Sequence, residues 1–139
     1  MFKKVLIPVD VEVPKETQKL LSAARTLTEN WNSELHVVTV VPNVGMAIVG
    51  TYLDENFETN SRKTAAAELA QAVAAAGLNA QQHVLSGTIY DRVIAVAAKL
   101  DVDLIVIGAH RPDLKDYLIG SNAARVVRHS KQSVLVIRD

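Results

Sequence analysis

Two glycines and a short polar run in the last third of the chain carry the strongest chemical signal. Gly108 directly follows the apolar run 104–107, and Gly120 precedes Ser121 and Asn122 at the start of a predicted helix. A strand that ends in glycine leaves bare backbone at the edge of a sheet. A helix N-terminus offers unpaired N–H groups and the positive end of a dipole. Together these features predict an anion site, best suited to a phosphate.

Two charged residues accompany the glycines. Arg111 lies in the loop between them, where its guanidinium would make a charge-assisted contact with a phosphate or would simply be a solvated loop charge. Asp10 ends the first apolar run, 5–9, and either faces the same crevice or caps the helix that follows. His110, beside Arg111, is expected to be exposed to solvent rather than catalytic.

The elements that must position these residues alternate along the chain. Apolar or β-branched runs predict strands at residues 5–9, 35–41, 81–85, 104–107 and 133–138. Apolar residues at helical spacing, with capping signals, predict helices over 14–30, 64–76, 89–100 and 121–129. The segment 43–56 fits neither period and is either a lid or contact surface or a loop folded onto the core.

This alternation predicts an α/β protein with an open, doubly wound parallel five-stranded sheet. The runs 5–9 and 104–107 are almost continuously apolar, which indicates central strands covered on both faces. The more polar run 81–85 suits an edge. With right-handed crossovers we predict the strand order 3-2-1-4-5, which places a ligand crevice at the ends of strands one and four. Asp10 and Gly108 both lie at that crevice.

Composition limits the class of protein. The 139 residues are enough for a single domain over 1–139. Lys and Arg number 15, as do Asp and Glu, which argues against nucleic-acid binding and against a polybasic membrane anchor. Cysteine is absent, which excludes disulfides and thiolate metal sites. No apolar run is long enough for a signal peptide or a membrane span, so we expect a cytoplasmic protein without membrane insertion.

The remaining histidines do not suggest a metal site. His36 lies in an apolar strand and is expected to be a satisfied core or edge histidine. His83 and His129 have no carboxylate or histidine at metal-ligand spacing. No metal ligand is therefore predicted among the side chains of the chain.

Motifs of several other protein classes are absent from the sequence. It has no Gly-x-x-x-x-Gly-Lys-Ser/Thr loop and no Gly-x-Gly-x-x-Gly after the first strand, which argues against P-loop ATPases and dinucleotide binding. The phosphorylatable Asp and the Lys of a response-regulator receiver are missing from their strand ends. No nucleophile–base pair for acyl transfer is evident.

The opening run Pro8-Val9-Asp10 and the stretch 108–123 together resemble the universal stress protein family, in its small single-domain, ATP-binding branch. The family signature is a glycine, two residues, a second glycine, nine residues, and then Gly-Ser or Gly-Thr. Gly108 and Gly120-Ser121 match it. Arg111 stands at the second glycine and the loop is one residue shorter, so a guanidinium contact or a differently closed loop is expected there.

The resemblance implies a Rossmann-like fold of the adenine nucleotide alpha hydrolase-like kind, with a role for each matching position. Asp10 would lie beside the adenosine, Val40 would offer backbone to the adenine, and Gly108 would admit the ribose and phosphates. The Gly120–Asn122 run would hold the phosphates. The expected nucleotide-binding residues, with no catalytic residue among them, are Pro8, Val9, Asp10, Val40, Ile107, Gly108, His110, Arg111, Gly120, Ser121 and Asn122.

One function is favoured and two alternatives remain. The favoured function is an ATP-binding regulatory or stress-response module, with Mg²⁺ carried on the phosphates and an unidentified regulatory protein as partner. The alternatives are a slow ATPase or phosphotransfer enzyme, and a partner-binding protein that has lost nucleotide affinity. The last strand, 133–138, carries four consecutive apolar residues at a predicted sheet edge. That edge predicts a homodimer through the strand, with a tetramer as the alternative assembly.

Overall fold

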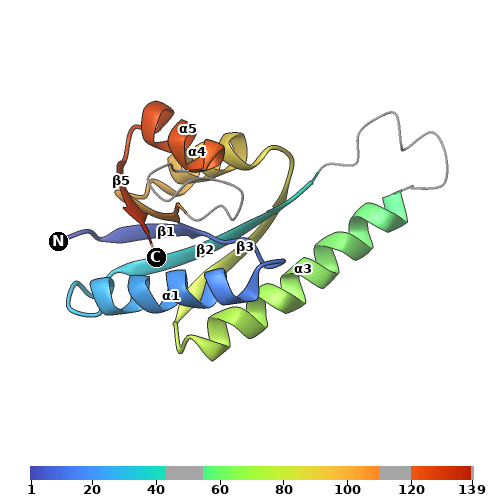
Figure 1. Cartoon of the computed structure of the whole chain (residues 1–139), viewed down its shortest axis with the longest axis horizontal. Helices are drawn as coiled ribbons and strands as arrows, with labels where there is room; N and C mark the ends of the chain where they lie inside the picture. The colour runs from blue at the N-terminus through green and yellow to red at the C-terminus, as the bar shows by residue number, and fades with distance from the viewer. Residues whose placement is uncertain (43–54, 110–119, 139) are drawn as a thin grey trace.

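A computed structural model describes residues 1–42, 55–109 and 120–138. Strands and helices alternate along it (Figure 1). The strands are β1 (Lys4–Pro8), β2 (Glu34–Val41), β3 (Ala80–Ser86), β4 (Leu104–Gly108) and β5 (Ser133–Ile137). The helices are α1 (Pro14–Thr28), α3 (Glu55–Ala75), α4 (Ile89–Leu100) and α5 (Ser121–His129).

The five strands form one parallel sheet in the order β3-β2-β1-β4-β5. This confirms the predicted α/β fold, the predicted strand order and the edge position of β3. The chain leaves β1 toward β2 on one side and leaves β4 toward β5 on the other. The direction of winding therefore reverses between β1 and β4, which is the place where such sheets bind ligands.

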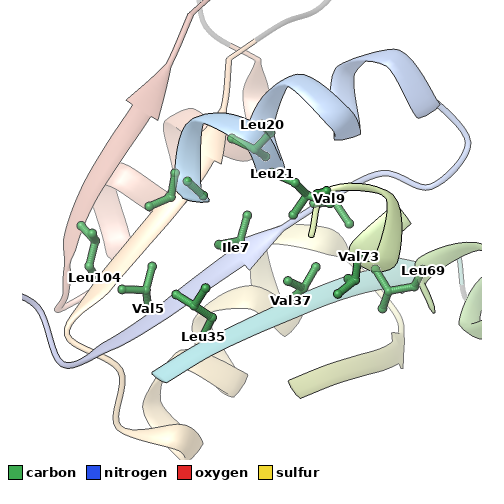
Figure 2. Close-up of a cluster of buried hydrophobic side chains, with 13 residues drawn as sticks. Val5, Ile7, Val9, Leu20, Leu21, Leu35, Val37, Leu69, Val73 and Leu104 are labelled. Carbon is green, nitrogen blue, oxygen red and sulfur yellow. The ribbon is translucent and has the colours of Figure 1, made fainter. Parts of the chain in front are cut away.

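Alternate residues of the central strand β1 face opposite layers of helices. Val5 and Ile7 pack with Leu21 of α1 and Leu69 of α3 in one buried cluster (Figure 2). Leu6 lies in the other cluster, beneath α4 and α5. Figure 1 shows the two pairs of helices on opposite sides of the sheet. The near-continuous apolar character of this strand follows from burial on both faces.

Local signals explain where most elements begin and end. Pro14 occupies the first turn of α1, where its missing N–H is not needed. Gly77 has φ +68° after α3, and its N–H donates to the Ala74 carbonyl, which closes the helix. Thr88 is the N-cap residue of α4, although its side chain makes no capping hydrogen bond.

Two local expectations are wrong. The helix expected over 64–76 begins at Glu55, because its first turns carry polar residues and present no apolar stripe for a sequence pattern to detect. Residues 55 and 56 of the segment expected to be irregular are thus helical, and its residues 43–54 lie outside the described residues. The helical spacing of the apolar residues over 89–100 predicts that Ile89 faces inward, but its side chain is 39% exposed because it is the first residue of α4.

The helices of the described part of the chain all belong to these two layers. None of them combines the length and the hydropathy that a bilayer crossing requires. The arrangement places Asp10, which follows β1, and Gly108, which ends β4, at the same carboxyl edge of the sheet.

Candidate functional site

A cavity of about 930 Å³ lies at the carboxyl edge of the sheet, where the winding reverses. Its walls come from the ends of β1, β2 and β4, from α1 and α3, and from the start of α5. Its size is within the range of pockets that hold nucleotide-sized ligands. The predicted crevice and the observed cavity therefore coincide.

The floor of the cavity is apolar. Val9, Val38 and Ile107 line it, and each of them is buried. Val9 follows β1, and Val38 and Ile107 belong to the neighbouring strands β2 and β4, so three adjacent strands contribute to the lining. Such a surface suits the flat face of an aromatic ring better than a charged group.

Asp10 faces the cavity and does not cap α1, whose N-cap is Val13 and has no side-chain capping bond. It lines the cavity, and its Oδ1 accepts the N–H of Glu12 at 3.0 Å in a local turn. Its carbonyl accepts the hydroxyl of Thr17 at 2.6 Å and the N–H of Val13. These contacts hold the loop between β1 and α1 in place, so the carboxylate is presented to the cavity on a fixed backbone.

Gly108 and Gly120 both line the cavity, and neither has the positive φ that requires glycine. Gly120 has φ −64° and ψ 155°, a conformation open to any residue. A Cβ built on Gly108 would meet only Leu20 Cδ2, at an ordinary contact distance of 3.8 Å. Backbone geometry and packing would therefore both admit a side chain at Gly108, and the backbone conformation would admit one at Gly120.

The N-terminus of α5 is suited to an anion. Gly120 is its N-cap and makes no side-chain capping bond, and the first turn has no acidic residue. The first helical bond runs from the N–H of Ala124 to the carbonyl of Gly120. The N–H groups of residues 121–123 therefore precede the helical ladder, and the helix dipole adds positive potential.

The structure brings most of the predicted site residues together. Within the described residues, those that line the cavity are Pro8, Val9, Asp10, Val40, Ile107, Gly108, Gly120 and Asn122. Ser121 is not among the lining residues; it is exposed at the first position of α5. His110 and Arg111 lie outside the described residues.

A wall from α3 was missed by the sequence reasoning. Its lining residues, at positions with helical spacing, are Asn60, Ser61, Thr64, Ala65 and Glu68. Their spacing is the only signal that could have identified them, because small and polar residues on a helix face normally indicate solvent. Helix α1 contributes a second missed group, Glu16, Thr17, Lys19 and Leu20.

Comparison with known proteins assigns the chain to a family. The family model for universal stress proteins matches residues 1–138. The chain belongs to the universal stress protein family. A curated relative, Universal stress protein A homolog 1 of Coxiella burnetii, is 32% identical over 143 residues, covering 98% of this chain and 96% of the relative.

Solved structures of universal stress proteins share the fold. One, a universal stress protein in complex with cAMP, matches with a TM-score of 0.73 at 19% identity, covering 99% of this chain and 97% of that one. Another, from Archaeoglobus fulgidus in complex with dAMP, matches with a TM-score of 0.69 at 18% identity, covering 98% of each chain. At these identities the likeness establishes the fold.

The charges around the cavity of this universal stress protein are unevenly placed. Four carboxylates are among the described lining residues. They lie in the loop before α1, on α1 and on α3, and are Asp10, Glu12, Glu16 and Glu68. Lys19 of α1 is the cation among the described lining residues, and the start of α5 carries no acid. A ligand with one anionic end would therefore place that end at α5 and its uncharged end at α1.

Metal-binding clusters are not found in this part of the chain. In the ranges 1–42, 55–109 and 120–138, no three His, Cys, Asp or Glu side chains are grouped so that they could hold a metal ion.

Proposed function

We propose that this chain binds an adenine nucleotide, ATP foremost, in the cavity at the carboxyl ends of β1 and β4. The observation that carries the proposal is the pair Gly108 and Gly120. Both line the cavity, and neither backbone conformation requires glycine. Bare backbone at two positions of one cavity allows the close approach that a phosphate chain and its ribose require.

The proposed orientation follows from the surfaces of the cavity. The adenine would lie on the apolar floor near Val9 and Val40, with the ribose near the carboxylate of Asp10. The phosphates would accept N–H groups at the start of α5, where no acidic side chain opposes them. The cAMP and dAMP complexes of the two structural neighbours support an adenine ligand.

Mg²⁺ would enter with the phosphates. A magnesium ion is commonly held by substrate phosphates and water with only one or two carboxylates, so it needs no protein cage. We propose binding rather than rapid turnover, because the first turn of α5, at the proposed phosphate position, carries no acidic side chain that could serve as a general base. The nucleotide would then set the conformation or assembly of a regulatory stress-response protein in the cytoplasm.

The proposal is tested with the purified protein. Heat denaturation should release an adenine nucleotide that mass spectrometry identifies. Titration calorimetry of the nucleotide-free protein should then show that ATP binds more tightly than adenosine, and that inorganic triphosphate alone binds weakly. Absence of heat with ATP, together with release of no adenine compound, would refute the proposed ligand.

A further inference from the structure

A hydrogen-bonded chain of three titratable side chains connects β2 with the edge strand β3. His36 of β2 is 2% exposed, and its Nδ1 lies 2.9 Å from Nε2 of His83 on β3. Its Nε2 lies 2.8 Å from Oε2 of Glu34. The two ring centroids are 5.2 Å apart and the ring planes are inclined by 26°. With nitrogens 2.9 Å apart, the rings therefore meet edge to edge rather than overlapping face to face.

The carboxylate of Glu34, at one end of this series of hydrogen bonds, determines where the protons lie. The ionised carboxylate of Glu34 only accepts, so Nε2 of His36 donates to it. Nδ1 of neutral His36 is then an acceptor, and Nε2–H of His83 donates to it. The pair thus holds a single proton between the two rings.

The two histidines can bind one further proton without breaking either hydrogen bond. It binds Nδ1 of His83, while the shared proton moves from Nε2 of His83 to Nδ1 of His36. His36 is then an imidazolium that donates to Glu34 and to His83. A second added proton cannot be bound in this way. The N–H of His36 and the N–H of His83 would then point at each other across 2.9 Å, and two positively charged rings would be neighbours.

The surroundings oppose that second proton. Burial lowers the pKa of His83 below its ordinary value, and the positive charges of His36 and of Lys99 on α4 lower it further. The hydrogen bond from His36 lowers the pKa of Glu34, so this carboxylate stays ionised. The Nζ of Lys4 on β1 lies 4.0 Å from Oε2 of Glu34 and competes with His36 for this carboxylate.

The pair lies within the strand pairing that supports the cavity. His83 is the register partner of Val38, and Val40 pairs with Leu85 two residues further on. Val38 and Val40 line the cavity, and α3, which forms one of its walls, packs on β3. Among the residues that the structure describes, β3 is an edge strand and pairs with β2 alone.

We propose that the His36–His83 pair is a pH-sensitive latch that holds the edge strand β3 on β2. The latch is closed while the pair carries no more than one added proton, and it opens when both rings are charged. Opening separates the strands at His83 and loosens the α3 wall. The latch requires no ligand, so it does not depend on the proposed nucleotide site.

The direction of the pH effect follows from proton linkage. In the open state the ring of His83 is solvated, and it takes up a proton near the ordinary histidine pKa of about 6.5. The closed pair resists the second proton, so the open state binds more protons in this range. The free energy of opening therefore falls as the pH falls through about 6.5, and β3 becomes less protected.

Amide hydrogen exchange of residues 80–86, corrected for the intrinsic rate, measures this opening in the ligand-free protein. Between pH 7.5 and 5.5 we expect exchange of β3 to accelerate about fivefold or more, with the central strand β1 unchanged. Wild-type protein whose β3 keeps its protection at pH 5.5 would overturn the proposal.

Two glutamine variants provide the comparison. In His83→Gln the side-chain amide still donates to His36 but takes up no proton, so the acceleration should fall below about twofold. His129→Gln replaces an exposed histidine at the end of α5 and should behave as the wild type does. Equal acceleration in His83→Gln and in the wild type would contradict the latch.

A second measurement does not depend on any variant. Nitrogen-15 chemical shifts of the wild-type imidazole rings report which nitrogens carry protons. In the folded protein at pH 5.5 we expect no population in which both rings are charged while the β3 amides remain protected. Observation of that population would exclude the latch even if His83→Gln failed to fold.

Discussion

At Gly108 the protein could accommodate a side chain that the proposed ligand could not. The residue lies at the end of β4 and lines the cavity, and its φ is not positive. A methyl group there would rest 3.8 Å from Leu20 Cδ2, which is normal packing. Selection for backbone approach therefore explains this glycine better than turn geometry does.

We expect Gly108→Ala to weaken ATP binding by about tenfold, or about 1.4 kcal/mol, because the methyl group occupies space next to the ribose and phosphates. Titration calorimetry measures the affinity. The thermal midpoint of unfolding should stay within a few degrees of the wild type, since nothing in the protein is displaced. Unaltered ATP affinity in a folded variant would remove Gly108 from the site.

Arg111 remains a prediction, because it lies outside the described residues. If its guanidinium contacts phosphate, Arg111→Ala should reduce the affinity for ATP and leave that for adenosine unchanged. Parallel titrations with the two ligands separate these effects. A similar loss for both ligands would indicate that the arginine shapes the loop instead.

At the scale of the elements, Asp103 joins β1 and β4 at the amino edge of the sheet. Its Oδ2 and Oδ1 accept the N–H groups of Lys3 and Lys4, each at 3.0 Å, and its own N–H donates to the Lys4 carbonyl. Desolvation by itself raises the pKa of Asp103. The backbone hydrogen bonds from Lys3 and Lys4, together with its own N–H and the positive charge of Lys3, outweigh it, and the pKa lies below the ordinary value.

Because this pKa is lowered on folding, ionised Asp103 stabilises the native state above its unfolded pKa of about 3.9. That contribution is lost as the pH falls through the lower, folded pKa. Asp103→Asn should therefore lower the unfolding midpoint at pH 7 and have less effect near pH 3. Asp101→Asn is the matched control, since Asp101 is exposed and its φ of 56° suits asparagine. Equal losses at both pH values would contradict the role of the charge.

At the scale of the whole molecule, β5 is the edge opposite β3. Its four apolar side chains are partly buried. Leu135 and Ile137 pack on one core cluster, and Val134 and Val136 pack on the other. What the edge offers a second copy is therefore chiefly its backbone N–H and C=O groups, with the half-buried side chains beside them.

We propose that two copies pair antiparallel through β5 across a two-fold axis. Light scattering of the wild type at micromolar concentration should then give the mass of a dimer, and Val136→Lys should shift it toward the monomer. Val127→Lys places the same charge on an exposed position of α5 and should leave the mass unchanged. Circular dichroism checks that both variants are folded. A wild-type mass of one chain would end the proposal irrespective of the variants.

The pattern of the sequence determined the fold and the edge of the sheet at which the cavity lies. Continuous apolar runs identify β1 and β4 as central, since a strand covered on both faces needs apolar residues at every position. Asp10 and Gly108 could be identified because they stand directly at the ends of those runs. These inferences succeed because the spacing of apolar residues and the order of the elements can be read from the sequence without knowledge of tertiary contacts.

Only the tertiary structure revealed the α3 wall, the exposed position of Ile89 and the pair of His36 with His83. The two histidines are 47 positions apart in the chain, and the register of β2 with β3 brings them within 2.9 Å. The wall residues of α3 have the composition of a solvated helix face, and only the packing of the helix places them at the cavity. Contacts between elements depend on register and on helix packing, and neither leaves a periodic signal in the sequence.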